Sequence, residues 1–386
     1  MRRTAESVSA GHPDKICDRI SDAILDDIIR CDSGEPRVAC ETLANTGMVI
    51  IAGEITTDCY VDIHSIVRRE LKNLGYVEDG HSLGFRADDV AVLPSIDEQS
   101  PDIASGVGKE ESGELGAGDQ GIMIGYAVRE SEDYMPLPAH LSHKLIKTVQ
   151  DIRKSDEINY LKPDGKCQVT VEYAPDTRQP KAVTDVVLSA QHDEGYLEKW
   201  REDAREIIAE VMGEYLAEEP ALHINPAGSF IIGSAKADAG LTGRKIVVDQ
   251  YGPSVPVGGG AFSGKDPTKV DRSGAYAARY LAKNILHAYP DLHSCKVEIS
   301  YAIGVTEPVA INFDFEPADA KVPSDLGEKV MSYIDLSPRG IIDYFNLFRP
   351  IYKQYCTYGH FGTVLEDDSS PLPPWEKLDL ARELMS

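Results

Sequence analysis

The chain has 386 residues, and 64 acidic side chains against 39 lysines and arginines give it a formal net charge of -25. This excess of acid argues against a nucleic-acid partner, because the phosphates would be repelled. Hydrophobic content of 42% and charged content of 27% are ordinary for a globular protein, and the length suits two or three domains. The apolar runs fall far short of the roughly 20 residues that cross a membrane, so we expect no membrane partner.

Seven cysteines are scattered along the chain without a C-x-x-C pair or a His/Cys cluster. The start, Met1-Arg2-Arg3, is not followed by the apolar core of a signal peptide. An odd number of cysteines in a large chain without an export signal predicts reduced thiols and a cytoplasmic location. The scattered positions also argue against zinc.

Apolar and turn patterns predict elements along the whole chain. Pro13 opens a helix over residues 13–30, and a second helix over 62–74 ends at Gly75. Three further helices are expected at residues 141–153, 196–216 and 273–286. Strands are expected at residues 37–44, 48–55, 91–93, 122–128, 167–173, 182–190, 246–249, 297–303 and 309–315.

Three positions near the N-terminus suggest chemistry. His12 and Asp14 lie where the first helix begins, and helix N-termini attract anions. A capping aspartate beside a solvated histidine is the alternative. Glu41 and Glu54 interrupt apolar strands, and each is either an exposed strand residue or a buried carboxylate with a cationic partner.

Residues 95–121 are rich in glycine, serine and acid and carry few core-forming side chains. A loop of this length in a compact domain is usually functional or disordered, and we interpret it as a mobile lid. Gly116 to Gly121 matches G-x-G-x-x-G, but the match follows a loop and precedes a strand. We therefore reject a dinucleotide site, which follows a strand and opens a helix.

The most informative stretch runs from Gly258 to Ser273. Three adjacent glycines give backbone that bends tightly and approaches a ligand closely. Lys265, Lys269 and Asp271 then suit a polyphosphate and its magnesium ion. Gly259 to Lys265 also fits most of a P-loop, but Asp266 replaces the hydroxyl that binds magnesium and Pro267 opposes a helix. We reject the P-loop.

Together, Gly11 to Lys15, Gly116 to Gly121 and Gly258 to Ser273 resemble the motifs of bacterial S-adenosylmethionine synthases. The similarity runs from about residue 7 to residue 377. It implies an α+β fold of three similar domains of mixed β-sheet with helices, in a pseudo-threefold arrangement. In sequence we expect an N-terminal domain at 1–100, a lid and hinge at 101–121, a central domain at 122–232 and a C-terminal domain at 233–386, interleaved in space.

The resemblance also implies the reaction and its partners. ATP and L-methionine would form S-adenosylmethionine, and the triphosphate would then be hydrolysed to pyrophosphate and phosphate. Two Mg²⁺ ions per site and K⁺ would be required. The chain would form a homodimer with shared active sites, commonly paired into a tetramer.

Residue roles follow from the same resemblance. Asp14 and Asp271 would bind Mg²⁺ and Glu41 would bind K⁺. ATP would contact His12, Asp164, Gly165, Lys166, Ser229, Phe230, Asp238, Arg244, Lys245, Ala261 and Lys265. Methionine would contact Glu54, Gln99, Asp119, Asp238 and Lys269. The catalytic set would be His12, Lys166, Arg244, Lys265 and Lys269. One departure is Ser229, where the family often has arginine.

These residue types suit that chemistry. A thioether sulfur has no proton to lose, so its attack on C5′ of the ribose needs no general base. The departing triphosphate gathers negative charge, which fixed cations stabilise. Two alternatives stay open at this point: a kinase-like phosphotransferase, for which no dedicated base is evident, and an inactive binding homologue, against which the retained charges argue.

Overall fold

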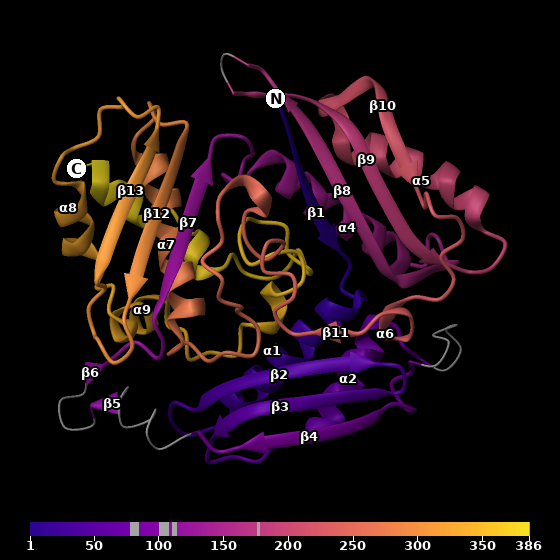
Figure 1. Ribbon diagram of the computed structural model, residues 1–386, viewed down its shortest axis with the longest axis horizontal. Helices are drawn as coiled ribbons and strands as arrows, with labels where there is room; N and C mark the ends of the chain where they lie inside the picture. The colour runs from indigo at the N-terminus through magenta and orange to yellow at the C-terminus, as the bar shows by residue number, and fades with distance from the viewer. Residues whose placement is uncertain (78–84, 100–107, 110–113, 176–177, 386) are drawn as a thin grey trace.

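The computed structural model describes residues 1–77, 85–99, 108–109, 114–175 and 178–385. Three main sheets surround a central group of helices, so that the molecule has three lobes (Figure 1). In this described part of the chain, no helix is both long and apolar enough to cross a membrane.

The first unit lies at the bottom of Figure 1. In chain order it contains α1 (Pro13–Cys31), β2 (Arg37–Asn45), β3 (Met48–Thr56), α2 (Ile63–Leu74) and β4 (Ala91–Asp97). β2 and β3 form an antiparallel hairpin, and β4 returns parallel to β3 after the helix. The short strand β11 (Gly240–Leu241), from much later in the chain, pairs with β2 and completes the sheet.

The second unit repeats this order. It contains α4 (Leu137–Lys154), β8 (Leu161–Tyr173), β9 (Pro180–His192), α5 (Leu197–Met212), the 3₁₀ turn η1 (Gly213–Tyr215) and β10 (Leu216–Ile224). The β8–β9 hairpin is antiparallel, and β10 returns parallel to β9. The N-terminal strand β1 (Arg2–Val8) pairs with β8 and completes this sheet.

The third unit contains α7 (Val270–Ala288), β12 (Ser294–Tyr301), β13 (Ala310–Glu316) and α8 (Leu326–Tyr333). Strand β7 (Gly121–Val128) completes its antiparallel sheet by pairing with β12. The remaining elements are short: β5 (Gly108–Lys109), β6 (Glu114–Leu115), α6 (Ser234–Ala237), η2 (Gly252–Ser254), α9 (Pro338–Phe345), η3 (Lys353–Tyr355), η4 (Pro374–Glu376) and α10 (Asp379–Met385).

The three units therefore share one topology, a helix, a hairpin and a second helix, and each sheet is completed by a strand from elsewhere in the chain. This confirms the expected α+β fold of three similar parts. Two of the sheets mix parallel and antiparallel pairs, whereas the third is antiparallel throughout its described strands. The boundaries proposed from the sequence stay a prediction.

Local chemistry accounts for the helix ends. Pro13 occupies the first turn of α1, where its missing N–H costs nothing, and Asp62 caps α2 by accepting the N–H of Ser65. Gly75 ends α2 with a φ of 99°, a conformation that glycine adopts readily. On α1, Ile16, Ile20, Ile24 and Ile28 are fully buried against the first sheet, as their helical spacing predicts.

Two predicted elements are wrong. Residues 246–249 form hydrogen-bonded turns, since the Asp249 N–H donates to the carbonyl of Lys245, just before the segment. The helix predicted to Leu216 stops at Met212, because Gly213 takes a φ of 50°. Residues after it form the unpredicted strand β10, and the strand β1 was also not predicted. Tertiary pairing overrides the local pattern in both strands.

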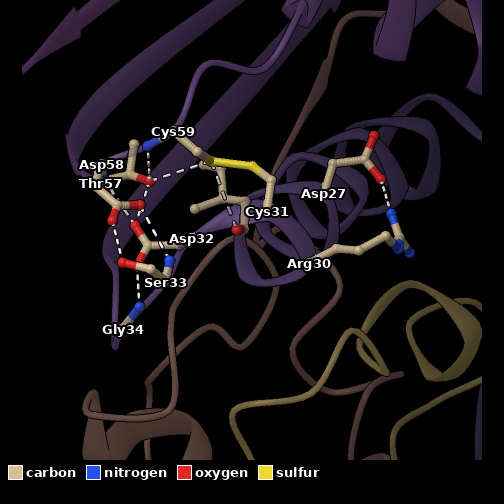
Figure 2. Close-up of a disulfide and its surroundings, with 10 residues drawn as sticks. Asp27, Arg30, Cys31, Asp32, Ser33, Gly34, Thr57, Asp58 and Cys59 are labelled. Atoms are coloured by element: carbon tan, nitrogen blue, oxygen red, sulfur yellow. Dashed lines mark hydrogen bonds and ion pairs between the residues drawn. A yellow bond between two sulfur atoms is a disulfide. The ribbon is translucent and has the colours of Figure 1, made fainter.

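The expectation of seven reduced thiols is wrong for one pair. Cys31, at the end of α1, forms a disulfide with Cys59, just after β3 (Figure 2). Packing of α1 against the β2–β3 hairpin brings the two Cα atoms to 6.0 Å, within the usual range for a disulfide. Asp32 accepts hydrogen bonds from Thr57 and Asp58 beside it. The other five cysteines are buried thiols.

Candidate active site

Four aspartates on one face of α1 hold the loops that carry the candidate site. They recur every fourth residue, so they line up along the helix. Each carboxylate accepts a backbone N–H from a distant segment: Leu241 donates to Asp14, Gly243 to Asp18, Gly264 to Asp22, and Tyr352 and Lys353 to Asp26. This role of the four aspartates was not predicted, although their four-residue spacing is visible in the sequence.

A first cluster of charged residues gathers where α1 begins. Lys245 bonds the Asp14 carboxylate, and Arg244 Nη1 lies 3.6 Å from it. Burial opposes ionisation of Asp14, yet its hydrogen bond with Lys245 lowers the net pKa of the carboxyl. Lys166 enters from β8 and pairs with Glu6 at 2.8 Å. Five predicted residues, including His12, therefore lie within reach of one another.

His12 is the N-cap of α1, with its Nδ1 accepting the Asp14 N–H at 3.2 Å. Burial, followed by the positive charge of Lys245, lowers the pKa of His12 to about 3. The imidazole is therefore neutral near pH 7. A neutral ring that accepts at Nδ1 carries its proton on Nε2, so His12 presents an N–H donor. The alternative of a solvated histidine is wrong, since this side chain is mostly buried.

The predicted nucleotide contacts adjoin this cluster. Asp164 accepts the Ser234 N–H at 2.6 Å, and burial raises its pKa to about 6. The ring of Phe230 lies against Gly233 in the same loop. Gly165 lies in β8 with the Ser9 N–H bonded to its carbonyl, while Ser229 and Asp238 are exposed, one before α6 and one directly after it.

A second cluster lies at the other end of β2. It lines a pocket of about 260 Å³ that we call the Arg37 pocket. Six predicted residues contribute to its wall: Glu54, Gln99, Asp119, Lys265, Lys269 and Asp271. Arg37, also in the wall, was missed. Lys265 is placed there because the backbone of residues 264–266 pairs with the start of β2.

Ion pairs organise the second cluster. Lys265 bonds Asp271, and Lys269 bonds Asp266. Asp266 is completely buried and also accepts the backbone N–H groups of Val38 and Thr268. The residue that ruled out a P-loop therefore anchors the glycine-rich stretch to the first sheet.

The glycines of this stretch mostly serve contacts within the protein. A Cβ on Gly258 would lie 1.8 Å from the Ile122 carbonyl oxygen, and one on Gly264 would lie 1.9 Å from that of Cys40. A Cβ on Gly260 would lie 2.5 Å from the Asp271 carboxylate. Gly259 alone of the three adjacent glycines is free of neighbours within 4 Å. Ala261 lies beside Gly243, between the two clusters.

The two clusters are separate within one chain. β2 pairs with Leu241 at Leu43 and with Lys265 at Ala39, four residues or ~13 Å apart along the strand. On α1, eight residues or ~12 Å separate Asp14 from Asp22, which holds the Gly264 N–H. The predicted magnesium ligands Asp14 and Asp271 therefore belong to different clusters, and Glu41 is exposed on β2 between them.

The described residues contain no group of three or more potential metal-ligating side chains. Residues 100–107 and 110–113 of the predicted lid lie outside the described residues.

Comparison with known proteins gives consistent matches along the chain. Residues 1–101, 114–230 and 232–377 match the models of the N-terminal, central and C-terminal domains of S-adenosylmethionine synthetase. Two curated relatives, both named S-adenosylmethionine synthase and from two strains of Staphylococcus epidermidis, are 49% identical over 389 residues. Each alignment covers 97% of this chain and 95% of the relative.

Proposed function

The chain belongs to the S-adenosylmethionine synthetase family, and from this premise we propose that it joins ATP and L-methionine by attack of the methionine sulfur on C5′ of ATP. Hydrolysis of the released triphosphate to pyrophosphate and phosphate follows on the same enzyme. The observation that carries the proposal is the separation of a cationic first cluster from a small second pocket of mixed charge. The first suits a polyphosphate and the second suits an amino acid.

The first cluster stabilises the leaving group. Lys166, Arg244 and Lys245 supply positive charge, and neutral His12 supplies a hydrogen-bond donor. Donors fixed before the reaction stabilise charge as it develops on the triphosphate, and each is worth roughly 3–4 kcal/mol. Phe230, with Ser229, Asp164, Gly165 and Asp238 around it, holds the adenosine end, and Ala261 contacts the nucleotide through its backbone. Lys265 completes the triphosphate site.

Magnesium fits the carboxylates that are present. Asp14 and Asp271 each lie against a lysine, Lys245 and Lys265, at the places where phosphates would bind. Magnesium typically uses one or two carboxylates together with phosphate oxygens and water, so single carboxylates suffice. Bound there, two Mg²⁺ ions would neutralise phosphate charge. Glu41, an exposed carboxylate, is our proposed contact for K⁺.

The second cluster binds methionine. Its pocket of about 260 Å³ lies below the 300–1,000 Å³ usual for drug-sized ligands, so it suits an amino acid rather than a nucleotide. Glu54, Gln99, Asp119 and Lys269 supply polar contacts, and Asp238 would reach the amino acid from the first cluster.

A second copy of the chain brings the two clusters together. In Figure 1, α1 and α2 lie on one side of the first sheet. The two clusters lie at opposite ends of β2, so the other, outer face of the sheet extends from one cluster to the other. Leu43, Ile50 and Leu93 lie side by side on it, in register across three strands, and Leu93 is 49% exposed. A twofold contact through this face is self-complementary, so it sets the first cluster of each chain against the second cluster of its partner. We therefore propose a homodimer with two shared sites, further paired into a tetramer. Because ATP is a substrate, we place the reaction in the cytoplasm.

Analysis of the products tests the function. The protein is incubated with ATP, L-methionine, Mg²⁺ and K⁺, and the products are measured by mass spectrometry and ³¹P NMR. We expect S-adenosylmethionine with equal amounts of pyrophosphate and phosphate. ADP with a phosphorylated product would support the kinase-like alternative instead, and accumulation of free triphosphate would contradict the hydrolysis step.

A further inference from the structure

Arg37 is the first residue of β2 and points to the outer face of the first sheet. It lies opposite Thr56 in β3, whose hydroxyl accepts the N–H of Gln99. Its side chain forms part of the wall of the Arg37 pocket, and its Nη1 atom is buried without a hydrogen-bond partner among the described residues. A buried guanidinium N–H without an acceptor is costly, so this atom indicates a missing partner.

The charges around it identify that partner. The pocket wall carries three cations, of which Lys265 is paired with Asp271 and Lys269 with Asp266. In the part of the chain that the structure describes, Arg37 has no carboxylate within ion-pair distance. Its near neighbour in sequence, Glu35, is held instead by two bonds from Arg339, at 2.6 and 2.7 Å. The pocket therefore offers one cation that is available to a ligand.

Two carboxylates in the same wall complement it. Glu54 and Asp119 form no ion pair among the described residues, and the only hydrogen bond to Asp119 there comes from the adjacent Gln120 N–H. Ala39 and the buried Val270 form the apolar part of the pocket wall. An unpaired cation, two unpaired anions and an apolar strip match the carboxylate, ammonium and apolar side chain of an α-amino acid.

We propose that Arg37 binds the α-carboxylate of the amino-acid substrate, while Glu54 and Asp119 receive its ammonium group. This inference rests on the proposed function and deepens it, because it assigns the substrate carboxylate to a residue outside the predicted methionine contacts. A planar guanidinium matches a carboxylate through two parallel hydrogen bonds, which fix orientation as well as affinity. Arg37 thus sets the angle from which the rest of the amino acid extends toward the ribose.

The test compares substrates with and without the carboxylate charge. Methionine and its methyl ester are each assayed with ATP, using the wild type, Arg37→Met and Arg37→Lys. Loss of a charge-assisted pair typically weakens binding by roughly 10- to 100-fold. We therefore expect Arg37→Met to raise the KM for methionine by about that factor and to leave the KM for ATP and for the methyl ester within about twofold. Arg37→Lys keeps the positive charge but cannot form two parallel hydrogen bonds, so an intermediate KM for methionine is expected.

Further measurements separate this role from a structural one. Lys296→Met, which breaks the ion pair with Asp314 on the third sheet, is the control and should leave the KM for methionine unchanged. Calorimetric titration of methionine in the presence of an ATP analogue with a methylene group in place of the 5′ oxygen, from which no triphosphate can leave, should show the same loss in Arg37→Met without any turnover. Equal increases for methionine and its ester, or no increase for either, would overturn the proposal.

Two safeguards keep the result interpretable. If Arg37→Met does not fold, the wild type and Arg37→Lys still test the proposal. Equal affinity of the wild type for methionine and its methyl ester would contradict a contact between Arg37 and the carboxylate. Failure of the proposed function is recognised separately, since wild type would then form no S-adenosylmethionine at all. If the wild type forms S-adenosylmethionine and Arg37→Met has an unchanged KM for methionine, only the proposed role of Arg37 is refuted.

Discussion

Asp22 of α1 and Arg272 of α7 form a fully buried, two-pronged ion pair, with nitrogen–oxygen distances of 2.7 and 2.8 Å. Asp22 also accepts the Gly264 N–H, and Arg272 donates to the Lys265 carbonyl at 3.1 Å. One pair thus joins the first unit to the third and positions the second cluster at the junction.

Replacing Asp22 by asparagine should destabilise the protein strongly. Arg272 would keep its burial but lose its counter-charge, and breaking one side of a buried pair costs about 3–5 kcal/mol. The Glu35–Arg339 pair has similar two-pronged geometry, but its side chains are 38% and 34% exposed, so Glu35→Gln should cost at most ~1 kcal/mol. Urea unfolding of both variants checks the contrast. Equal losses in the free energy of unfolding would show that burial does not determine how much the Asp22–Arg272 pair stabilises the protein.

Lys265→Ala should lower turnover by roughly 10²- to 10³-fold, because one fixed donor to the leaving group is lost. Lys296 is the control, since it also pairs with an aspartate, Asp314 at 2.7 Å, but on the third sheet. Lys296→Ala should keep wild-type kcat. Circular dichroism and thermal unfolding establish that Lys265→Ala is folded, and a folded variant with normal kcat would remove Lys265 from the site.

A mixing experiment tests whether each site is shared. Lys245→Met damages the first cluster and Lys265→Met damages the second. If each site combines the two clusters across a twofold axis, a mixed dimer has one site with both defects and one site with none. Random pairing of equal amounts makes half of the dimers mixed, so about a quarter of wild-type activity should return. Absence of any recovery from co-expressed variants would contradict sites shared between chains.

The carboxyl of Asp26 should make stability depend on pH. Burial raises its pKa to about 7, against the hydrogen bonds from Tyr352 and Lys353. Its folded pKa exceeds the unfolded value of 3.8, so its stabilising contribution is complete below about pH 4 and is lost as pH rises through about 7. Asp26→Asn stays neutral throughout but can accept only one of the two N–H bonds. Relative to wild type, it should be less stable at pH 4.5, by ~1 kcal/mol, and the deficit should shrink toward pH 8. Denaturant unfolding at several pH values measures this difference, and a constant difference contradicts the shifted pKa.

The Cys31–Cys59 disulfide closes a loop with a sequence separation of 28 residues. In the chain-entropy account such a loop stabilises the folded state by up to ~3–4 kcal/mol. Because Cys31 is exposed, dithiothreitol should lower the thermal midpoint of the wild type. The double variant Cys31→Ser, Cys59→Ser should have the lowered midpoint already and should not respond to the reductant. A response in that variant would show that another effect of dithiothreitol is responsible.

Sequence patterns predicted the structure correctly where local backbone chemistry determines it. Pro13 and Gly75 mark helix ends through their own backbone preferences, and both were recognised. The failures concern contacts between distant segments. Residues 216–224 form a strand because β9 is there to pair with them, and nothing in their own pattern specifies that neighbour.

The same limit applies to the site. The resemblance supplied the predicted residues, but not their division between two ends of β2, which depends on where Leu241 and Lys265 pair with that strand. Arg37 was missed because its significance lies in the partners that its neighbours already have, which only a folded structure shows. The buried anchor Asp266 likewise looked like a defect in a motif.

Completion of each sheet by a remote strand affects how the chain folds during synthesis. β2, β3 and β4 leave the ribosome early, but β11, which pairs with β2, begins only at Gly240. At about 5–20 residues per second, translation of the intervening segment takes on the order of 10–30 s. During that interval the edge of β2 lacks its native neighbour and is open to chaperones or to other nascent chains. Stalled ribosomes carrying chains that end before and after β11 should therefore differ in the protease resistance of the first unit.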